Sequence, residues 1–236
     1  MNANNKAPNF IASSDVSSHS RRRFLRGLGL GAALWTVRGA FAEELSRKTA
    51  AVEEGPFYPP KLPLDTDNDL IIVYDSITPA VGEITHLSGR LLSASGAPIR
   101  NGTIEIWSTD HDGIYLADQG NQARFDSHFQ GFGRFLTGST GEYYFRTIKP
   151  VHYSGRPARH IHFKVKMKGR SEWTTQLFVK GDPGNERDGV YKGIGDQAAR
   201  ASVTMDFAPI KDSRIGELAA RFDIVLDVTP RDEDAH

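Results

Sequence analysis

Hydrophobic and polar residues alternate strictly over residues 160–167. This alternation predicts a strand with one buried face, whose apolar side chains are Ile161, Phe163, Val165 and Met167. His160 and His162 then project together from the other face, about 6–7 Å apart along the strand. At that spacing two imidazoles can bind one metal ion, whereas the alternative is a pair of surface histidines at the start of a strand.

Other apolar runs, separated by turn signals such as Ser-Gly, Asp-Gly and Pro-Gly, predict further short strands. The expected strands span residues 84–92, 103–108, 143–148, 160–167, 174–179, 201–207 and 222–228. Residues 70–74 are a further strand candidate, and residues 212–220 are a helix candidate. About seven strands at this spacing indicate an all-β fold, a β-sandwich. The irregular stretch 113–135 is where we expect a long functional loop.

The residues before the first long strand are expected to form an N-terminal arm. Residues 43–52 are a short helix candidate, but the sequence Glu-Glu-Gly-Pro-Phe-Tyr-Pro-Pro over 53–60 favours an extended path, because proline disfavours a helix. The predicted organisation is therefore a leader at 1–42, an arm at 43–80 and a β-sandwich domain at 81–230.

The leader has the layout of an export signal. A Ser-Arg-Arg-Arg-Phe-Leu-Arg motif over 20–26 precedes an apolar run over 27–37 and an Ala-Phe-Ala cleavage motif at 40–42. The apolar run is too short to span a membrane, and the motif resembles a twin-arginine signal. We therefore expect an exported, periplasmic protein with no membrane segment in its mature form. A general secretory signal or an uncleaved anchor is the alternative.

Composition excludes several classes of partner and site. The chain has 29 basic and 29 acidic residues and a formal net charge of zero, so a nucleic-acid partner is not expected. Cysteine is absent, which excludes disulfides, cysteine-based zinc sites, iron–sulfur clusters and a thiol nucleophile.

Two histidines need further ligands to complete a metal site. A carboxylate is a common choice beside a histidine pair, but no Asp or Glu lies at a compelling spacing. Tyrosines do, since Tyr153 precedes His160 by seven residues and Tyr115 follows a predicted strand and an Asp-Gly turn. Phenolate is a hard anionic ligand that suits ferric iron, and a strong Lewis acid is needed to ionise a phenol whose pKa is near 10.

Several motifs, taken in chain order, resemble one family. They are Gly96-Ala-Pro-Ile99, Gly102-x-x-Glu105-Ile-Trp107, Asp110-x-x-Gly113-x-Tyr115, Phe129-x-Gly-x-Gly-Arg134, Gly141-x-Tyr-x-Phe145-x-Thr147-Ile-x-Pro150-x-x-Tyr153, His160-Ile-His-Phe163 and Thr175-Gln-Leu-Phe178. Over residues 53–180 the ordered set resembles the core of the intradiol ring-cleavage dioxygenases, which include protocatechuate 3,4-dioxygenase and catechol 1,2-dioxygenase. Each motif alone is weak, whereas the ordered set is specific.

The resemblance implies a β-sandwich that binds ferric iron, Fe(3+), through four side chains. Tyr115 and His160 would be equatorial ligands, and Tyr153 and His162 axial ligands. A small aromatic diol would displace Tyr153, bind the metal and become open to attack by O2. The ring would then open between the two hydroxylated carbons, giving a muconate-type product.

The resemblance also implies which residues surround the diol. Gln176 matches a pocket glutamine beside the metal. Four residues of the arm match a segment that borders the substrate: Gly55, Pro56, Phe57 and Tyr58. The family's active-site arginine lies three residues before the first histidine, where this chain has Pro157. Arg156 is therefore the expected cation beside the substrate, and Arg159 is the alternative.

Two other functional classes compete with an exported iron(III) intradiol dioxygenase. A non-catalytic exported β-sandwich binding module would share the scaffold, but it would have no reason to keep two tyrosines and two histidines together. A zinc hydrolase would prefer His, Cys and carboxylate ligands. The sequence leaves open which catechol derivative is the substrate and whether the protein forms a homo-oligomer.

Overall fold

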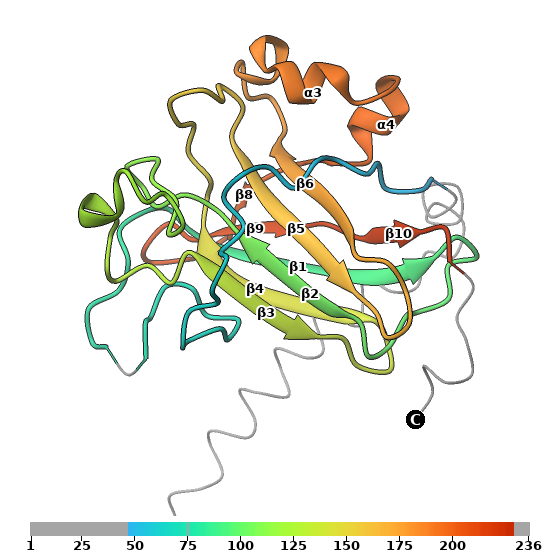
Figure 1. Cartoon of the computed structure of the whole chain (residues 1–236), viewed down its shortest axis with the longest axis horizontal. Coiled ribbons are helices and arrows are strands. Elements are labelled where there is room, and N and C mark those ends of the chain that lie inside the picture. Colours follow the sequence, from blue (N-terminus) through green and yellow to red (C-terminus); the bar gives the residue numbers. More distant parts are fainter. Residues whose placement is uncertain (1–46, 75, 229–236) are drawn as a thin grey trace, which may run out of the picture. The chain divides into compact units, whose positions relative to one another are not determined.

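Two five-stranded sheets form the framework of the protein (Figure 1). The computed structural model describes residues 47–74 and 76–228. The predicted leader at 1–42 and the first residues of the predicted arm lie outside the described residues. Within them, the expected all-β class and β-sandwich are confirmed.

The first sheet contains β1 (Ile84–Ser93), β4 (Glu142–Ile148), β8 (Ala208–Pro209), β9 (Leu218–Arg221) and β10 (Ile224–Leu226). Strand β4 runs antiparallel to β1. Strand β9 pairs in parallel with the first half of β1, and β10 pairs in parallel with its second half. Between β9 and β10, the Phe222 amide donates to the Ser88 carbonyl at 2.8 Å, and Phe222 is fully buried.

The second sheet contains β2 (Thr103–Trp107), β3 (Phe132–Leu136), β5 (His160–Lys166), β6 (Trp173–Val179) and β7 (Thr204–Met205), in the order β3-β2-β5-β6-β7. All neighbours are antiparallel except β7, which runs parallel to β6. In this register His162 lies opposite Trp107 on one side and Gln176 on the other. The sheet therefore brings two residues of the predicted site, His162 and Gln176, side by side.

The hydrophobic core lies between the two sheets. Ile161, Phe163 and Val165 are fully buried, as the alternation along β5 predicts. The ring of Phe163 contacts those of Phe222 and Tyr143 on the other sheet, at centroid distances of 5.1 and 6.2 Å. Burial of side chains of this size contributes about 1.5–3 kcal/mol each to folding.

The opposite face of β5 is buried as well, which corrects the prediction of a half-buried strand. His160, His162 and Lys164 are 3%, 2% and 4% exposed. The arm, blue in Figure 1, crosses this face and hydrogen-bonds to β6, where the Val52 amide donates to the Thr174 carbonyl at 3.1 Å. The face of β5 that was predicted to be exposed to solvent is therefore buried beneath the arm.

The described start of the arm is extended, so the helix candidate at 43–52 is wrong over residues 47–52. Its first residues bind β10: the Thr49 amide donates to the Val225 carbonyl, and the Val225 amide donates to Thr49 Oγ1, both at 2.9 Å. Ala50 then accepts a hydrogen bond from Thr175 Oγ1 at 2.7 Å. Because β10 and β6 belong to different sheets, the arm connects the two layers.

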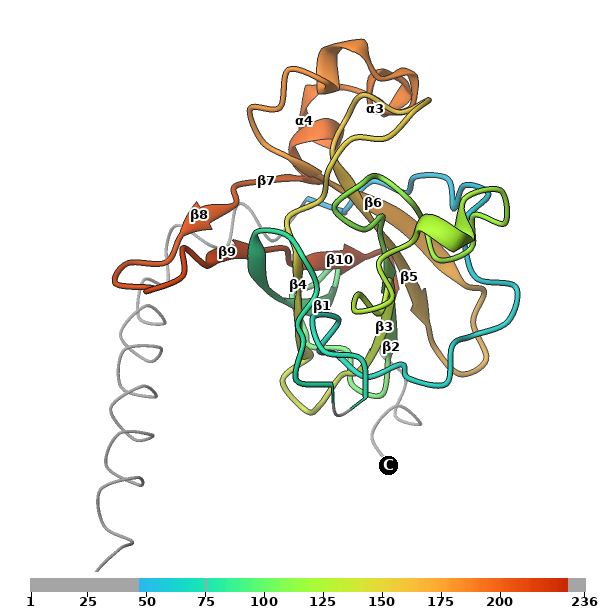
Figure 2. The same cartoon turned by 90° about the vertical axis from the view of Figure 1, so that its left-hand side faces the viewer.

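Two short helices, α3 (Gly189–Gly193) and α4 (Gln197–Ala201), lie beyond the end of β6 (Figure 2). Neither was predicted, because five residues are too few to show a helical period. Residues 201–207 were expected to be a strand, but only β7 forms there. In the part of the chain that the structure describes, no helix has both the length and the apolar character needed to cross a membrane.

Two other predictions from the sequence are wrong, and a third is wrong only at its end. Residues 212–220 form a turn and β9 instead of a helix, since Asp212 and Gly216 adopt positive φ angles of 66° and 75°. Residues 70–74 form turns, because the Asp69 carboxylate binds the Ile71 amide at 3.1 Å. The expected loop at 113–135 is confirmed over residues 113–131, which are largely irregular, but its last residues belong to β3, whose Phe132 is fully buried.

Candidate metal centre

Strand β5 positions the two histidines as its alternation predicts. The Tyr115 hydroxyl lies 3.2 Å from His160 Nε2 and 2.9 Å from His162 Nε2. The imidazole centroids are 4.8 Å apart. Three potential ligand atoms from two distant segments therefore converge on one buried position.

A rigid turn holds Tyr115. The carboxylate of Asp110, itself fully buried, accepts hydrogen bonds from the Asp112 and Ile114 amides at 3.0 and 2.9 Å. Gly113 has a φ of 79°, which favours glycine, and a Cβ there would lie 3.1 Å from the His152 carbonyl oxygen. Tyr115 is consequently fixed by the Asp-Gly turn that the sequence indicates.

Tyr153 lies against the same position but in a looser turn. Its ring contacts Tyr115 edge to face at 5.2 Å and lies 6.0 Å from His160. Across the turn it pairs with Arg156 through backbone hydrogen bonds of 3.3 and 3.0 Å. The structure therefore brings together all four predicted metal ligands, with Tyr153 on the more exposed side.

Burial controls the protonation of these groups. Desolvation lowers the pKa of His160 to about 4, with a smaller contribution from Arg156, and it lowers the pKa of His162 well below its usual value. Both imidazoles are therefore neutral near pH 7 and can act as ligands. Desolvation and the neighbouring Tyr153 raise the pKa of Tyr115 well above 10, so its phenol ionises only beside a strong cation.

The surroundings orient the histidines for metal binding. His160 Nδ1 lies 2.7 Å from the Ala158 carbonyl oxygen and donates to it, which leaves the Nε2 lone pair directed at the site. The ring of His162 stacks on Trp107 at 4.9 Å with an interplanar angle of 9°. Its buried Nδ1 has no hydrogen-bond partner among the described residues.

Two neutral imidazoles and two phenols that need a strong cation for ionisation fit a ferric ion. The described residues contain no group of three or more His, Cys, Asp or Glu side chains that could hold a metal. The zinc-hydrolase alternative therefore lacks its preferred ligand set in this part of the protein.

Arg156 and Gln176 adjoin the four tyrosine and histidine side chains. Arg156 Nη2 donates to Gln176 Oε1 at 3.0 Å, and Gln176 Nε2 donates to the Glu53 carbonyl at 2.9 Å. The charge of Arg156 influences the pKa of all four predicted ligands. The Arg159 amide instead donates to Asp182 Oδ2 at 2.8 Å, so the geometry favours Arg156 over Arg159 as the cation of the site.

The arm forms one wall. Phe57 stacks on Tyr115 at 4.5 Å and meets Tyr153 edge-on at 5.9 Å. Gly55 lies so close to His162 that a Cβ on it would be 3.3 Å from His162 Cε1. Pro56 connects Gly55 to Phe57. These contacts agree with the predicted placement of the segment at the border of the site.

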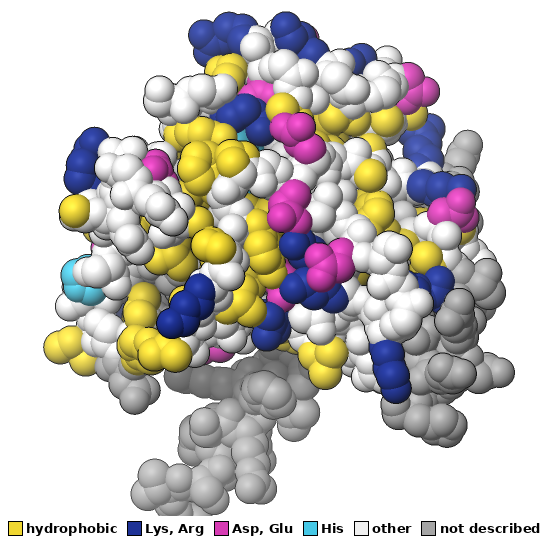
Figure 3. Space-filling model, viewed as in Figure 1, with side chains coloured by type: hydrophobic (Ala, Val, Ile, Leu, Met, Phe, Trp, Pro, Cys, Tyr) yellow, Lys and Arg dark blue, Asp and Glu magenta, His cyan; other side chains and the backbone are white. Residues whose placement is uncertain are grey.

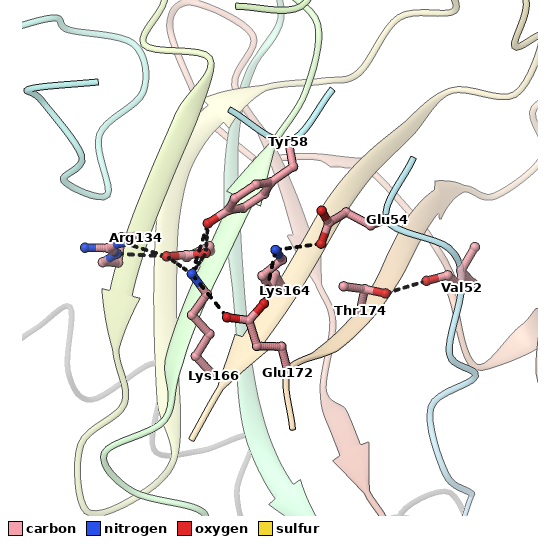
Figure 4. A network of polar contacts seen from close by, with 9 residues as sticks. Val52, Glu54, Tyr58, Arg134, Lys164, Lys166, Glu172 and Thr174 are labelled. Carbon is pink, nitrogen blue, oxygen red and sulfur yellow. Dashed lines mark hydrogen bonds and ion pairs between the residues drawn. The ribbon is translucent and has the colours of Figure 1, made fainter. Parts of the chain in front are cut away.

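Tyr58 also has a structural role, which the sequence did not indicate. Its hydroxyl donates to Glu105 Oε2 at 2.8 Å and accepts from Lys166 Nζ at 3.0 Å, while Lys164 Nζ lies 3.4 Å from its ring centroid (Figure 4). The ring also contacts Trp107 edge to face at 5.1 Å. Tyr58 therefore anchors the arm and supports the tryptophan behind His162.

Glu105 is the centre of this anchoring network. It is fully buried and forms ion pairs with Arg134 at 2.7 Å and Lys166 at 3.0 Å. Burial alone would raise the pKa of Glu105, but hydrogen bonds from Arg134, Lys166 and Tyr58 outweigh burial and lower it. On the surface, acidic and basic side chains gather near the middle of this face, beside an apolar area (Figure 3). Charge pairing thus secures the arm over the sheet.

Asp188 is a second buried carboxylate that the sequence did not reveal. Its Oδ2 accepts a hydrogen bond from Arg156 Nε at 2.7 Å. Burial would raise the pKa of Asp188, but the bond from Arg156 and backbone amides lower it, so the carboxylate stays charged. The only sequence signal was its position as a potential helix N-cap before residues 189–193.

Comparison with known proteins agrees with the geometry. A family model described as Dioxygenase matches residues 53–228. The protocatechuate 3,4-dioxygenase beta chain of Burkholderia cepacia is 35% identical over 164 residues, which cover 64% of this chain and 68% of that protein. Hydroxyquinol 1,2-dioxygenase of Corynebacterium glutamicum is 28% identical over 222 residues, covering 84% of this chain and 69% of that protein.

A solved structure supports the same assignment. The dioxygenase domain of a dioxygenase carbohydrate-binding protein fusion from Streptomyces sp. SirexAA-E superposes with a TM-score of 0.59 at 29% sequence identity, covering 78% of this chain and 100% of that domain. Since the family match spans residues 53–228, which include both sheets, and the named relatives are a protocatechuate 3,4-dioxygenase and a hydroxyquinol 1,2-dioxygenase, this chain belongs to the intradiol ring-cleavage dioxygenase family.

Proposed function

We propose that this enzyme uses ferric iron and O2 to cleave catechol-type diols between their two hydroxylated carbons. The convergence of Tyr115 on both histidine Nε2 atoms, with Tyr153 packed against them, carries the proposal. Both oxygen atoms of O2 enter the muconate-type product, so the reaction needs no external reductant. When bound, the ferric ion would supply Lewis acidity and the electron transfer that lets a diol react with O2.

The side chains would divide the remaining work. Tyr115, Tyr153, His160 and His162 would hold the ion. An ionised Tyr153 oxygen would accept a proton from the incoming diol, because a phenolate is basic enough for this role. Arg156, oriented by Gln176 at 3.0 Å, would stabilise negative charge on the diol oxygens.

The walls of the site match an aromatic substrate. Phe57 offers an apolar ring beside the two tyrosines, which excludes water from the reacting atoms. The relatives are named for protocatechuate and hydroxyquinol, and ring substituents would be read by residues 55–58 and the loop over 113–131. Neither the site nor the relatives favour the non-catalytic binding module.

A panel of diols tests the proposed function. We expect the iron-loaded enzyme to be reddish, since ferric phenolate absorbs visible light. It should consume one O2 per diol with at least one of catechol, protocatechuate and hydroxyquinol, measured with an oxygen electrode and by product absorbance. A colourless iron-loaded protein, or no uptake with any catechol derivative, would contradict it.

We further propose export by the twin-arginine route, which rests on the Ser-Arg-Arg-x-Phe-Leu motif at 20–25. Replacing Arg21 and Arg22 by lysine should trap the full-length precursor in the cytoplasm, while the unmodified chain should be recovered from the periplasm with its first residue near Glu43. Fractionation and mass spectrometry of the N-terminus measure both. Normal export of the double-lysine variant would argue against this route.

A further inference from the structure

The segment between β6 and α3 binds the turn that leads into β5. Asp182 Oδ2 accepts a hydrogen bond from the Arg159 amide at 2.8 Å. Six residues later, Asp188 Oδ2 accepts one from the Ala158 amide at 3.3 Å. Between them, Gly184 packs so tightly that a Cβ would lie 1.9 Å from the Pro157 carbonyl oxygen. The two segments are therefore in direct backbone contact immediately before His160.

Asp188 accepts hydrogen bonds from several groups in this contact. It is fully buried, and the side chain of Arg156 is only 13% exposed. Its Oδ2 accepts from both Arg156 Nε at 2.7 Å and the Ala158 amide. Its Oδ1 accepts from the Tyr191 amide at 3.0 Å as the N-cap of α3. One carboxylate thus joins the guanidinium, the backbone before β5 and the helix.

Each of the two groups that donate to Asp188 Oδ2 is itself hydrogen-bonded to a residue of the metal centre. The Ala158 peptide that donates to Asp188 presents its carbonyl to His160 Nδ1 at 2.7 Å. The guanidinium held through Nε extends Nη2 to Gln176 at 3.0 Å. No hydrogen bond in the described structure joins Asp188 to a predicted ligand, so its hydrogen bonds reach the site through Ala158 and Arg156. Its negative charge also acts directly on Tyr153 and His160, where it favours a higher pKa.

We propose that Asp188 is a positioning residue of the reaction, which orients Arg156 directly and His160 through the Ala158 peptide. This inference rests on the proposed function, because it assigns the arginine and the histidine their roles there. Groups that orient a metal-binding histidine typically change metal affinity or activity by about 10–100-fold when they are removed. A capping role for α3 alone would have no such effect.

The variant Asp188→Asn separates the two roles. Asparagine caps a helix as well as aspartate does, so its Oδ1 can keep the Tyr191 amide. Its Nδ2, however, only donates and cannot accept from Arg156 or from Ala158. The matched control is Asp196→Asn, because the exposed Asp196 caps α4 through the Ala199 amide at 2.8 Å and has no contact with the site.

We expect Asp188→Asn to bind iron roughly 10–100-fold more weakly in chelator competition and to lose kcat/KM for the diol, while Asp196→Asn matches the unmodified enzyme. We also expect the double variant Asp188→Asn/Arg156→Gln to lose less kcat/KM than the product of the two single fold-losses. The free-energy effects of coupled residues are not additive. If Asp188→Asn behaves like Asp196→Asn in both measurements, or if its effect adds fully to that of Arg156→Gln, the proposal is wrong.

A measurement on metal-free protein keeps this test independent of the proposed function. Nitrogen-15 NMR of the histidine rings, assigned with His160→Ala, reports which ring nitrogen carries the proton. Unmodified protein and Asp196→Asn should show His160 protonated on Nδ1, and Asp188→Asn should show a mixture of tautomers. An unchanged His160 signal in Asp188→Asn would overturn the positioning of His160, whereas absent diol turnover in the unmodified enzyme would overturn only the proposed function.

Discussion

Replacing His162 by alanine is expected to abolish most iron binding and the visible colour of the protein. His162 is 2% exposed, and its Nε2 lies 2.9 Å from the Tyr115 hydroxyl. One face of its ring is covered by Trp107, whose ring centroid lies 4.9 Å away, and an alanine side chain offers no atom that could bind the metal in its place. The same result is expected for His160→Ala, because each imidazole is one of the two predicted nitrogen ligands.

The melting temperature should fall together with the iron content. A metal that binds only the folded state, present at about a hundredfold excess over its Kd, stabilises by about 2.7 kcal/mol. For a domain of this size such a loss lowers Tm by about 5–10 °C. Metal analysis, the visible spectrum and a thermal melt with and without added iron measure these effects. In metal-free samples the difference in Tm should shrink.

The matched control is His128→Ala, which removes an exposed histidine paired with Asp126 on a loop. It should keep the iron content, colour and Tm of the unmodified protein. Full iron occupancy with unchanged colour in either His160→Ala or His162→Ala would mean that these histidines are not ligands.

The two tyrosines should respond differently to phenylalanine. Tyr115 is buried in a turn fixed by Asp110, so Tyr115→Phe should weaken iron retention and change the resting colour. Tyr153 is half-buried in a turn where Gly155 adopts a φ of 104°, so it is freer to move away when a diol binds. Tyr153→Phe should keep much of its iron but lose the base that takes a proton from the diol.

The expected defect of Tyr153→Phe is slow binding of the diol. General base catalysis typically contributes about 10²–10⁴-fold, so anaerobic binding of catechol should slow by about that factor. Stopped-flow mixing without oxygen, followed by addition of oxygen, separates this step from ring opening. Tyr144→Phe, which removes a tyrosine of the other sheet that hydrogen-bonds His86, is the control and should bind catechol normally. An unmodified binding rate in Tyr153→Phe would refute its role as the displaced base.

Local patterns predicted the residues that point into the site. Alternation along β5 placed His160 and His162 on one face, and the Asp-Gly turn placed Tyr115. These features depend on neighbours only a few positions away, so a single sequence contains them. The antiparallel register then brought Gln176 beside His162, in agreement with the family resemblance.

The supporting carboxylates could not be predicted in the same way. Asp188 meets Arg156 across 32 positions, and Glu105 meets Arg134 across 29. Neither pair belongs to a periodic pattern, and a buried carboxylate in a sequence looks the same as a solvated one. The short helix α3 escaped prediction for a related reason, since Phe178 and its neighbours stabilise this region by tertiary packing.

The hydrogen bonds between Thr49 and Val225 have a consequence for the order of folding. They join residues 176 positions apart, so the arm cannot reach its final place during synthesis until nearly all of the sandwich has been made. Contacts of such long sequence separation form slowly, because the entropy of closing the loop is lost before they stabilise anything. Since Phe57 of the same arm stacks on Tyr115, we expect the candidate metal centre to be among the last parts of the molecule to form.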